Sequence, residues 1–164
     1  DFSLFAITGN KRGGYDIDQL LERLKEVPGK DAIQDIIVAG CGNLGSALMK
    51  YPGFEREGMR IRAGFDSNPH RVDETDNIPV YAMDRMDEFI KSHGIRIGLI
   101  AVPDFAAQQV SDAMIAAGIK GIMNFAPIRV RVPEDVVINT VNLALELENI
   151  VYFVNAREKS GTGD

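Results

Sequence analysis

The fold of this chain is decided by Ile36-Ile37-Val38-Ala39-Gly40-Cys41-Gly42-Asn43-Leu44-Gly45, an apolar run that ends in three glycines spaced G-x-G-x-x-G. The pattern predicts a strand, a tight turn and the start of a helix, an arrangement that binds the pyrophosphate of a dinucleotide. Gly40 would permit the turn, Gly42 would let the ligand approach the backbone, and Gly45 would let the helix pack on the strand. The alternative is that the glycines only shape a sharp strand-to-helix turn.

A carboxylate follows at the spacing typical of dinucleotide-binding folds. The run Arg60-Ile61-Arg62-Ala63-Gly64-Phe65 predicts a second strand and ends in Asp66, about 20 positions after Gly45. An acid at this place accepts hydrogen bonds from ribose hydroxyls and repels a 2′-phosphate, which favours NAD(H) over NADP(H). The alternative is a solvated acid in a turn.

Strand and helix patterns alternate along the rest of the chain. Further strands are expected over 78–81, 97–102, 121–125 and 136–140, and helices over 16–27, 46–50, 85–92, 105–117 and 143–156. Such alternation predicts an α/β fold, a Rossmann-type parallel sheet with flanking helices. Ligands of this fold lie beyond the carboxyl ends of the strands, here at Gly40, Asp66, Val102-Pro103 and Asn124-Phe125-Ala126-Pro127.

Composition limits the remaining possibilities. The 164 residues fit about one domain, and 45% of them are hydrophobic, but no apolar run is long enough to span a membrane. A net charge of −6 argues against nucleic-acid binding by the bulk of the chain. We therefore expect a soluble, cytoplasmic protein without a metal site. Its one cysteine, Cys41, is interpreted as a small filler residue, the alternative being a redox thiol.

The C-terminal helix carries more apolar side chains than one face can hold. They are Leu143, Leu145, Leu147, Ile150, Val151, Tyr152, Phe153 and Val154. This distribution predicts that the helix docks into a second subunit. The alternative is a helix buried in its own domain.

Several motifs taken together resemble the Rex family of redox-sensing transcriptional repressors. They are Lys11-Arg12-Gly13-Gly14-Tyr15, Gly40 to Ser46 with Ala47-Leu48, Tyr51-Pro52-Gly53-Phe54, Phe65-Asp66, Ala101-Val102-Pro103, Gly118-Ile119-Lys120-Gly121, Asn124-Phe125-Ala126-Pro127 and Val132-Pro133-Glu134-Asp135-Val136. The resemblance covers nearly the whole chain.

The resemblance implies a homodimer in which an N-terminal winged helix binds operator DNA and a Rossmann domain senses the ratio of NADH to NAD⁺. Terminal helices are exchanged between subunits in that family. On this basis residues 1–15 are expected to be the remnant of the winged helix, its wing and link. Residues 16–141 would then form the NAD(H)-binding domain, and residues 142–164 the dimerisation helix and tail.

The resemblance also assigns roles to individual residues. Cofactor contacts are implied for Gly40, Gly42, Asn43, Leu44, Gly45, Asp66, Val102, Pro103, Asn124, Phe125, Ala126 and Pro127. Tyr51 matches a tyrosine of the redox switch, or is an aromatic spacer, and Lys11 and Arg12 match the DNA-binding wing, or lie in a solvated turn. The family often has aspartate where this chain has Asn142, so a switch that depends on charge at that position is in doubt, although a hydrogen bond remains available. Asn68 likewise replaces a frequent second acid after Asp66.

Two other functions use the same fold. A dehydrogenase needs a proton donor near its substrate, but His70 and His93 do not follow predicted strands and are expected at the surface. A coenzyme A module would require basic residues for the 3′-phosphate, which Asp66 would repel. We therefore expect no catalytic residues and a sensor that works by shifting a population between two subunit arrangements.

Overall fold

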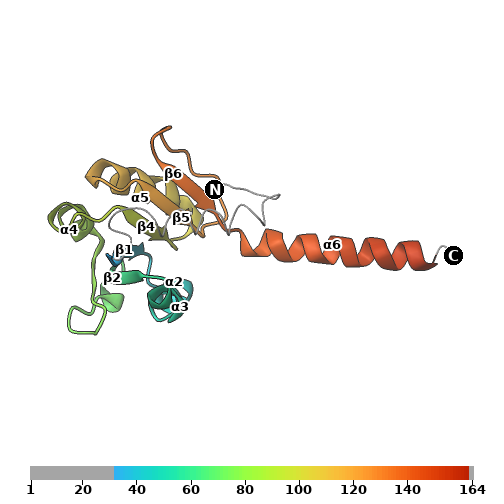
Figure 1. The fold of residues 1–164 in the computed structure, drawn as a ribbon, viewed down its shortest axis with the longest axis horizontal. Helices are drawn as coiled ribbons and strands as arrows, with labels where there is room; N and C mark the ends of the chain where they lie inside the picture. The colour runs from blue at the N-terminus through green and yellow to red at the C-terminus, as the bar shows by residue number, and fades with distance from the viewer. Residues whose placement is uncertain (1–31, 163–164) are drawn as a thin grey trace.

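The computed structural model describes residues 32–162, which form a sheet domain and one long helix (Figure 1). The strands are β1 (Gln34–Ala39), β2 (Met59–Asp66), β3 (Val80–Ala82), β4 (Ile97–Ile100), β5 (Gly121–Asn124) and β6 (Val137–Thr140). The α-helices are α2 (Asn43–Met49), α3 (Gly53–Arg56), α4 (Met86–His93), α5 (Asp104–Ala117) and α6 (Leu143–Thr162). Two short 3-10 helices, η1 (Pro69–Arg71) and η2 (Met83–Arg85), lie in the connections.

The six strands form one parallel sheet in the order β3-β2-β1-β4-β5-β6. The strand order reverses between β1 and β4, so the connections leave these two neighbouring strands in opposite directions. Ligands of open parallel sheets bind beyond the carboxyl ends of strands at such a reversal. The predicted Rossmann-type sheet with flanking helices is confirmed, and the glycine turn lies at this place.

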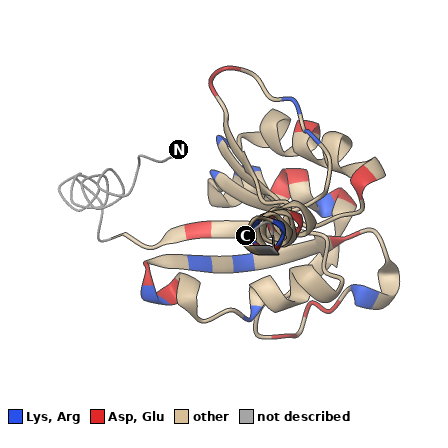
Figure 2. Cartoon of the chain, turned by 90° about the vertical axis from the view of Figure 1, so that its right-hand side faces the viewer, with Lys and Arg blue, Asp and Glu red and all other residues tan. Residues whose placement is uncertain are grey.

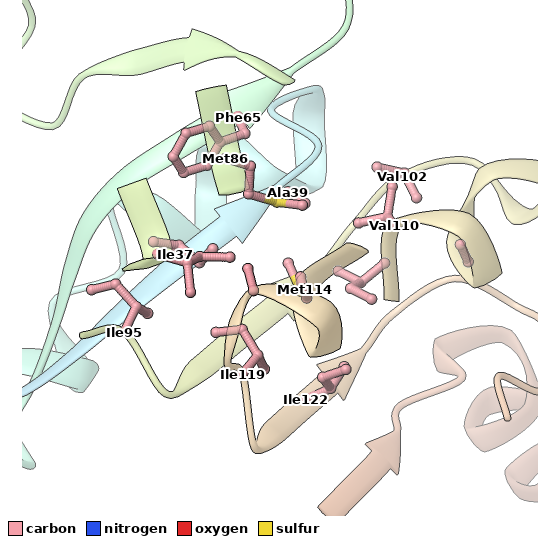
Figure 3. Close-up of a cluster of buried hydrophobic side chains, with 14 of the residues drawn as sticks. Ile37, Ala39, Phe65, Met86, Ile95, Val102, Val110, Met114, Ile119 and Ile122 are labelled. Atoms are coloured by element: carbon pink, nitrogen blue, oxygen red, sulfur yellow. The ribbon is translucent and has the colours of Figure 1, made fainter. Parts of the chain in front are cut away.

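Strand β1 supplies side chains to a core on each face of the sheet, because successive side chains of a strand point to opposite sides. Ile37 and Ala39 belong to the larger core, where Met86 of α4 and Met114 of α5 cover the sheet (Figure 3). The smaller core is closed by residues of α2 and α3 and is built around Ile36, Val38, Cys41, Met49, Ile61, Val80 and Leu99. Helices therefore cover both faces, as the continuous apolar run of β1 predicts.

Several expected boundaries differ from the structure. Strand β3 begins two residues later than expected, and β4 ends at Ile100 rather than at residue 102. The helix expected over 46–50 begins three residues earlier, as α2, and is followed by the short helix α3, which begins directly after Pro52. Helix α6 continues to Thr162, six residues beyond the expected end. The helix expected over 16–27 and the winged-helix remnant over 1–15 lie outside the described residues.

Helix α6 projects away from the sheet domain (Figure 1). Its eight large apolar side chains from Leu143 to Val154 are each about half exposed or more, between 49% and 67%. The alternative that this helix is buried in its own domain is therefore wrong for the part of the chain that the structure describes. No helix within residues 32–162 is both long enough and apolar enough to cross a membrane.

One buried hydroxyl in the larger core gives a stability prediction. Ser111 of α5 is fully buried, and its Oγ has no hydrogen-bond partner among residues 32–162. An unsatisfied buried polar group costs about 1–3 kcal/mol. We expect Ser111→Ala to raise the free energy of unfolding by about 1 kcal/mol, measured by urea denaturation. Ser92→Ala, at an exposed position of α4, is the control, and a Ser111→Ala protein less stable than wild type would contradict the prediction.

Candidate functional site

The glycine turn connects β1 to α2 through two close backbone contacts. Gly40 has a φ of 95°, and a Cβ there would lie 2.6 Å from the carbonyl carbon and oxygen of Ala101. A Cβ at Gly45 would collide with the carbonyl oxygen of Gly40. Neither position accepts a side chain, because the turn packs against its own helix and against the end of β4.

Gly42 differs from the other two glycines of the motif. It has a φ of −73°, which any residue adopts, and the nearest atom to a Cβ there would be Cζ of Arg71, at an ordinary contact distance of 3.7 Å. No side chain caps α2, which begins at the next residue. The fold itself therefore does not require glycine at position 42, and only the end of the half-exposed Arg71 side chain lies near the space above its backbone.

Asp66 lies at the end of β2 and joins that strand to the glycine turn. Its Oδ2 accepts a hydrogen bond of 2.7 Å from the backbone N–H of Cys41, and its Oδ1 accepts one of 2.8 Å from the N–H of Asn68. The residue is only 5% exposed. The alternative of a solvated turn acid is therefore wrong, and the carboxylate is fixed beside the turn at the place expected for a ribose ligand.

Arg71 completes the charge distribution around this carboxylate. Its Nη1 lies 3.6 Å from Oδ2 of Asp66, while its guanidinium side chain is half exposed. The guanidinium also approaches the space above Gly42. The sequence indicates an arginine near this loop, but not that its side chain returns over the glycine turn.

The loop after β5 is shaped by a buried amide, Asn124. The side chain accepts a 3.0 Å hydrogen bond from the N–H of Ala126 and donates to the carbonyl oxygens of Ala126 and Ile128, at 3.2 and 3.1 Å. Asn124 is fully buried, so within the described structure it fixes the course of the loop. Its predicted role in cofactor binding is untested; this arrangement supports an indirect role through the loop backbone.

Gln108 of α5 holds the next part of the same loop. Its Nε2 donates to the carbonyl oxygen of Arg131, and its Oε1 accepts from the N–H of Arg131, both at 2.9 Å. One side chain thus pairs with both backbone polar groups of Arg131, as a neighbouring strand would. Sequence reasoning missed it, because a glutamine on a helix carries no signal for a partner 23 residues away.

The remaining predicted cofactor residues surround this edge of the sheet. Val102 and Ala126 are almost fully buried and Phe125 is partly buried, whereas the other four are exposed: Asn43, Leu44, Pro103 and Pro127. Val102 follows β4. Phe125 follows β5 and extends the pairing of β5 with β4, because its N–H donates to the carbonyl oxygen of Ile100. The topology therefore brings the predicted loops after β1, β2, β4 and β5 to one edge of the sheet.

The two predicted switch residues lie at other places. Tyr51 follows α2, is 53% exposed and packs edge-on against Phe54, with ring centroids 4.9 Å apart. Asn142 caps α6, because its Oδ1 accepts a 3.0 Å hydrogen bond from the N–H of Leu145. Lys11 and Arg12, predicted to bind DNA, lie outside the described residues.

A cavity of about 330 Å³ lies beside Tyr51, away from the glycine turn. It is lined by Met49, Tyr51, Phe54, Glu55, Met59, Arg60, Ile61, Arg62, Asn77 and Ile78. Arg60 and Arg62 are both paired with Asp35 on the neighbouring strand at 3.0 Å. No group of three or more potential metal ligands of the His, Cys, Asp or Glu type occurs within residues 32–162.

Comparisons with known proteins place these observations in a family. Residues 31–128 match the family model described as a CoA binding domain. The redox-sensing transcriptional repressors Rex of Streptococcus pyogenes serotypes M5 and M49 are each 37% identical over 158 residues, which cover 94% of this chain and 74% of the relative.

Solved structures of a Rex-family repressor are also similar to this chain. The repressor RSP in complex with β-NADH is similar with a TM-score of 0.76 and 32% identity, over 90% of this chain and 72% of the other. The same repressor with β-NAD⁺ and operator DNA has a TM-score of 0.76 and 34% identity, over 90% and 70% of the two chains. Both similarities extend over the sheet domain and most of the remaining chain.

Cys41 is predicted to be chemically inert in the folded protein. Burial, followed by the nearby negative charge of Asp66, raises the pKa of its thiol from 9.0 to about 11. Since the unfolded thiol loses its proton at lower pH than the folded one, the thiol's contribution to stability should fall as pH rises from about 9 to about 11. We therefore expect the stability difference between wild type and Cys41→Ala to shift in favour of the variant between pH 8 and pH 10, measured by urea denaturation.

A thiol reagent such as DTNB supplies the second readout for Cys41. At pH 8 we expect the native thiol to react far more slowly than the thiol of the urea-unfolded chain, because the thiolate is the reactive form. Equal rates in the two states would show that Cys41 is an accessible thiol.

Proposed function

The chain belongs to the Rex family of redox-sensing transcriptional repressors, and from this we propose that residues 16–141 are an NAD(H)-binding sensor domain of such a repressor. The observation that carries the proposal is the difference among the three glycines. Packing requires glycine at positions 40 and 45, whereas a side chain at position 42 would meet only the half-exposed guanidinium of Arg71, at an ordinary contact distance. A dinucleotide pyrophosphate fits there, close to the carboxylate of Asp66 that would accept the ribose hydroxyls.

The nicotinamide ring would lie toward the loops after β4 and β5. NADH and NAD⁺ differ by a hydride and by one charge on this ring, so a mostly apolar surface discriminates between them. Val102, Phe125 and Pro127 supply apolar groups at this edge, and Asn124 fixes the loop that carries two of them. The cofactor contacts proposed here are those expected from the sequence, with Asn124 acting through its loop.

The charge distribution supports DNA binding outside the sheet domain. Figure 2 shows Lys and Arg interspersed with Asp and Glu over the described part of the chain, without a continuous basic face in this view. Phosphate contacts require clustered basic residues. We propose that operator DNA is bound by the preceding winged helix, to which Lys11 and Arg12 contribute, and that the protein works in the cytoplasm as bacterial transcription regulators do.

The positions of the two histidines support a sensor without catalytic activity. His93 stacks on Phe89 at the end of α4, and the following connection leads into the amino end of β4. It therefore lies at the edge of the sheet opposite the glycine turn. His70 is in η1, one residue before Arg71, at the end where the adenosine would bind. Neither histidine is placed to donate a proton near the nicotinamide.

Coenzyme A remains the second candidate ligand, because the matched family model is described as a CoA binding domain. It carries a phosphate on the adenosine ribose, which the buried carboxylate of Asp66 would repel. Titration of the full chain with NADH, NAD⁺ and coenzyme A separates the candidates. Binding of coenzyme A alone would replace the proposed function.

The site itself is tested by Gly42→Val. We expect the variant to fold, because its side chain would meet only the end of the Arg71 side chain. It should bind NADH about a hundredfold more weakly, a loss of about 3 kcal/mol of binding free energy, since the valine fills the pyrophosphate position. Circular dichroism and fluorescence titration of NADH give the two readouts. Ala113→Val, which introduces the same side chain at an exposed position of α5, controls for general effects, and tight NADH binding by folded Gly42→Val would refute the placement.

Helix α6 supports the proposed homodimer. Five consecutive apolar residues, 150–154, point in all directions around the helix, because successive residues of an α-helix are about 100° apart. All five are about half exposed or more. A single flat surface covers one side of a helix, so we propose that α6 is inserted between surfaces of a partner subunit, reciprocally in both directions.

Light scattering after size-exclusion chromatography tests this arrangement. The wild-type chain is expected to be a dimer, and Ile150→Glu/Phe153→Glu a monomer or an aggregate with an intact sheet domain, since burying two carboxylates in an apolar interface is unfavourable. Deleting residues 142–164 should have the same effect. Ile33→Glu is the control, because Ile33 is an equally exposed apolar residue outside α6. A wild-type chain that is monomeric at micromolar concentration would contradict the proposal.

A further inference from the structure

Two oppositely charged side chains share the adenosine end of the proposed site. The carboxylate of Asp66 is buried and accepts two backbone hydrogen bonds, so its position is fixed. The guanidinium of Arg71 comes from the last residue of η1, five residues beyond the strand end, and lies 3.6 Å from this carboxylate. It also lies 3.7 Å from the place that a Cβ on Gly42 would occupy. The cation therefore lies beside both the ribose position and the phosphate position.

Within the Asp66–Arg71 ion pair, the side chain of Arg71 is not tightly held. Arg71 is half exposed, and ion pairs between partly exposed groups contribute little to stability. The side chain is therefore able to rotate toward another anion without disturbing the fold. A guanidinium binds a phosphate through two parallel hydrogen bonds, which makes arginine a preferred partner for ribose phosphates.

We propose that Arg71 is a second determinant of dinucleotide specificity, and that the pair of Asp66 and Arg71 decides between a ribose hydroxyl and a ribose 2′-phosphate. This inference rests on the proposed NAD(H) function. While Asp66 is ionised, its charge repels a 2′-phosphate and attracts the guanidinium. When the carboxylate is removed, Arg71 is left at the ribose position as an unopposed phosphate-binding group, and a 2′-phosphorylated dinucleotide is accepted.

The chain offers a matched control for the arginine. Arg85 is exposed to the same extent as Arg71, 50%, and is likewise paired with an acid, Glu74, at 3.2 Å. It ends η2, which follows β3, a strand separated from β1 by β2, and its guanidinium lies over the ring of Tyr81, 4.5 Å from the centroid. Arg85→Glu changes the net charge by the same amount as Arg71→Glu, so effects that depend only on net charge appear in both variants.

The experiment compares NADH and NADPH, which carry the same fluorescent ring and differ only in the 2′-phosphate. Wild type is expected to bind NADH at least about tenfold more tightly than NADPH. In Asp66→Asn the preference should shrink by about tenfold or reverse, and in Asp66→Asn/Arg71→Ala this gain in NADPH affinity should be lost. The gain should also weaken with added salt, because it depends on a charged contact at a partly exposed site.

A second set of variants keeps Asp66 and its backbone hydrogen bonds intact. Arg71→Glu should widen the preference of the wild-type site for NADH over NADPH by about tenfold, whereas Arg85→Glu should leave the ratio unchanged. This inference alone would be overturned if Asp66→Asn/Arg71→Ala kept the gain in NADPH affinity, or if Arg71→Glu kept the wild-type ratio of NADH to NADPH affinity. Failure of the wild-type chain to bind NADH in the same titration would overturn the proposed function and this inference with it.

Discussion

The structure depends on one steric constraint, the approach of Gly45 to the carbonyl oxygen of Gly40. A methyl group at position 45 would collide with this oxygen and force α2 away from the turn, whereas one at position 40 would collide with the backbone of Ala101 after β4. The same turn lies against the backbone of Ala101 after β4 and donates the N–H of Gly40 to Phe65 at the end of β2. The ends of three neighbouring strands are therefore fixed relative to one another before any ligand binds.

The elements that sequence predicted well are those whose limits depend on local signals. Strand β1 is an apolar run that ends at a glycine, and α5 lies between Pro103 and Gly118, which takes a φ of 125° at the helix end. The short elements α3, η1 and η2 were not predicted, because single helical turns have too few residues for a periodic pattern. Helix α6 was expected to be shorter, since its last residues are polar and carry no apolar periodicity.

The structure brings together the loops on which sequence placed the candidate site, but sequence did not predict how their residues are held. The topology of alternating strands and helices dictates which loops meet, whereas a hydrogen bond between Asp66 and the backbone of Cys41 depends on side-chain positions 25 residues apart. The pattern likewise cannot distinguish an asparagine that contacts a ligand from one, such as Asn124, whose amide shapes the loop. Asn142 did carry a signal, because asparagine before a helix is a preferred cap.

Because the apolar surface of α6 is exposed, the stability of this helix depends on the protein concentration. A helix of 20 residues that makes few contacts with its own domain gains most of its stability from whatever covers it. If that cover is a second copy, folding of the helix and association of the subunits are one equilibrium, governed by mass action. Melting temperature would then rise with protein concentration, and dilution would unfold α6 and separate the subunits in the same transition.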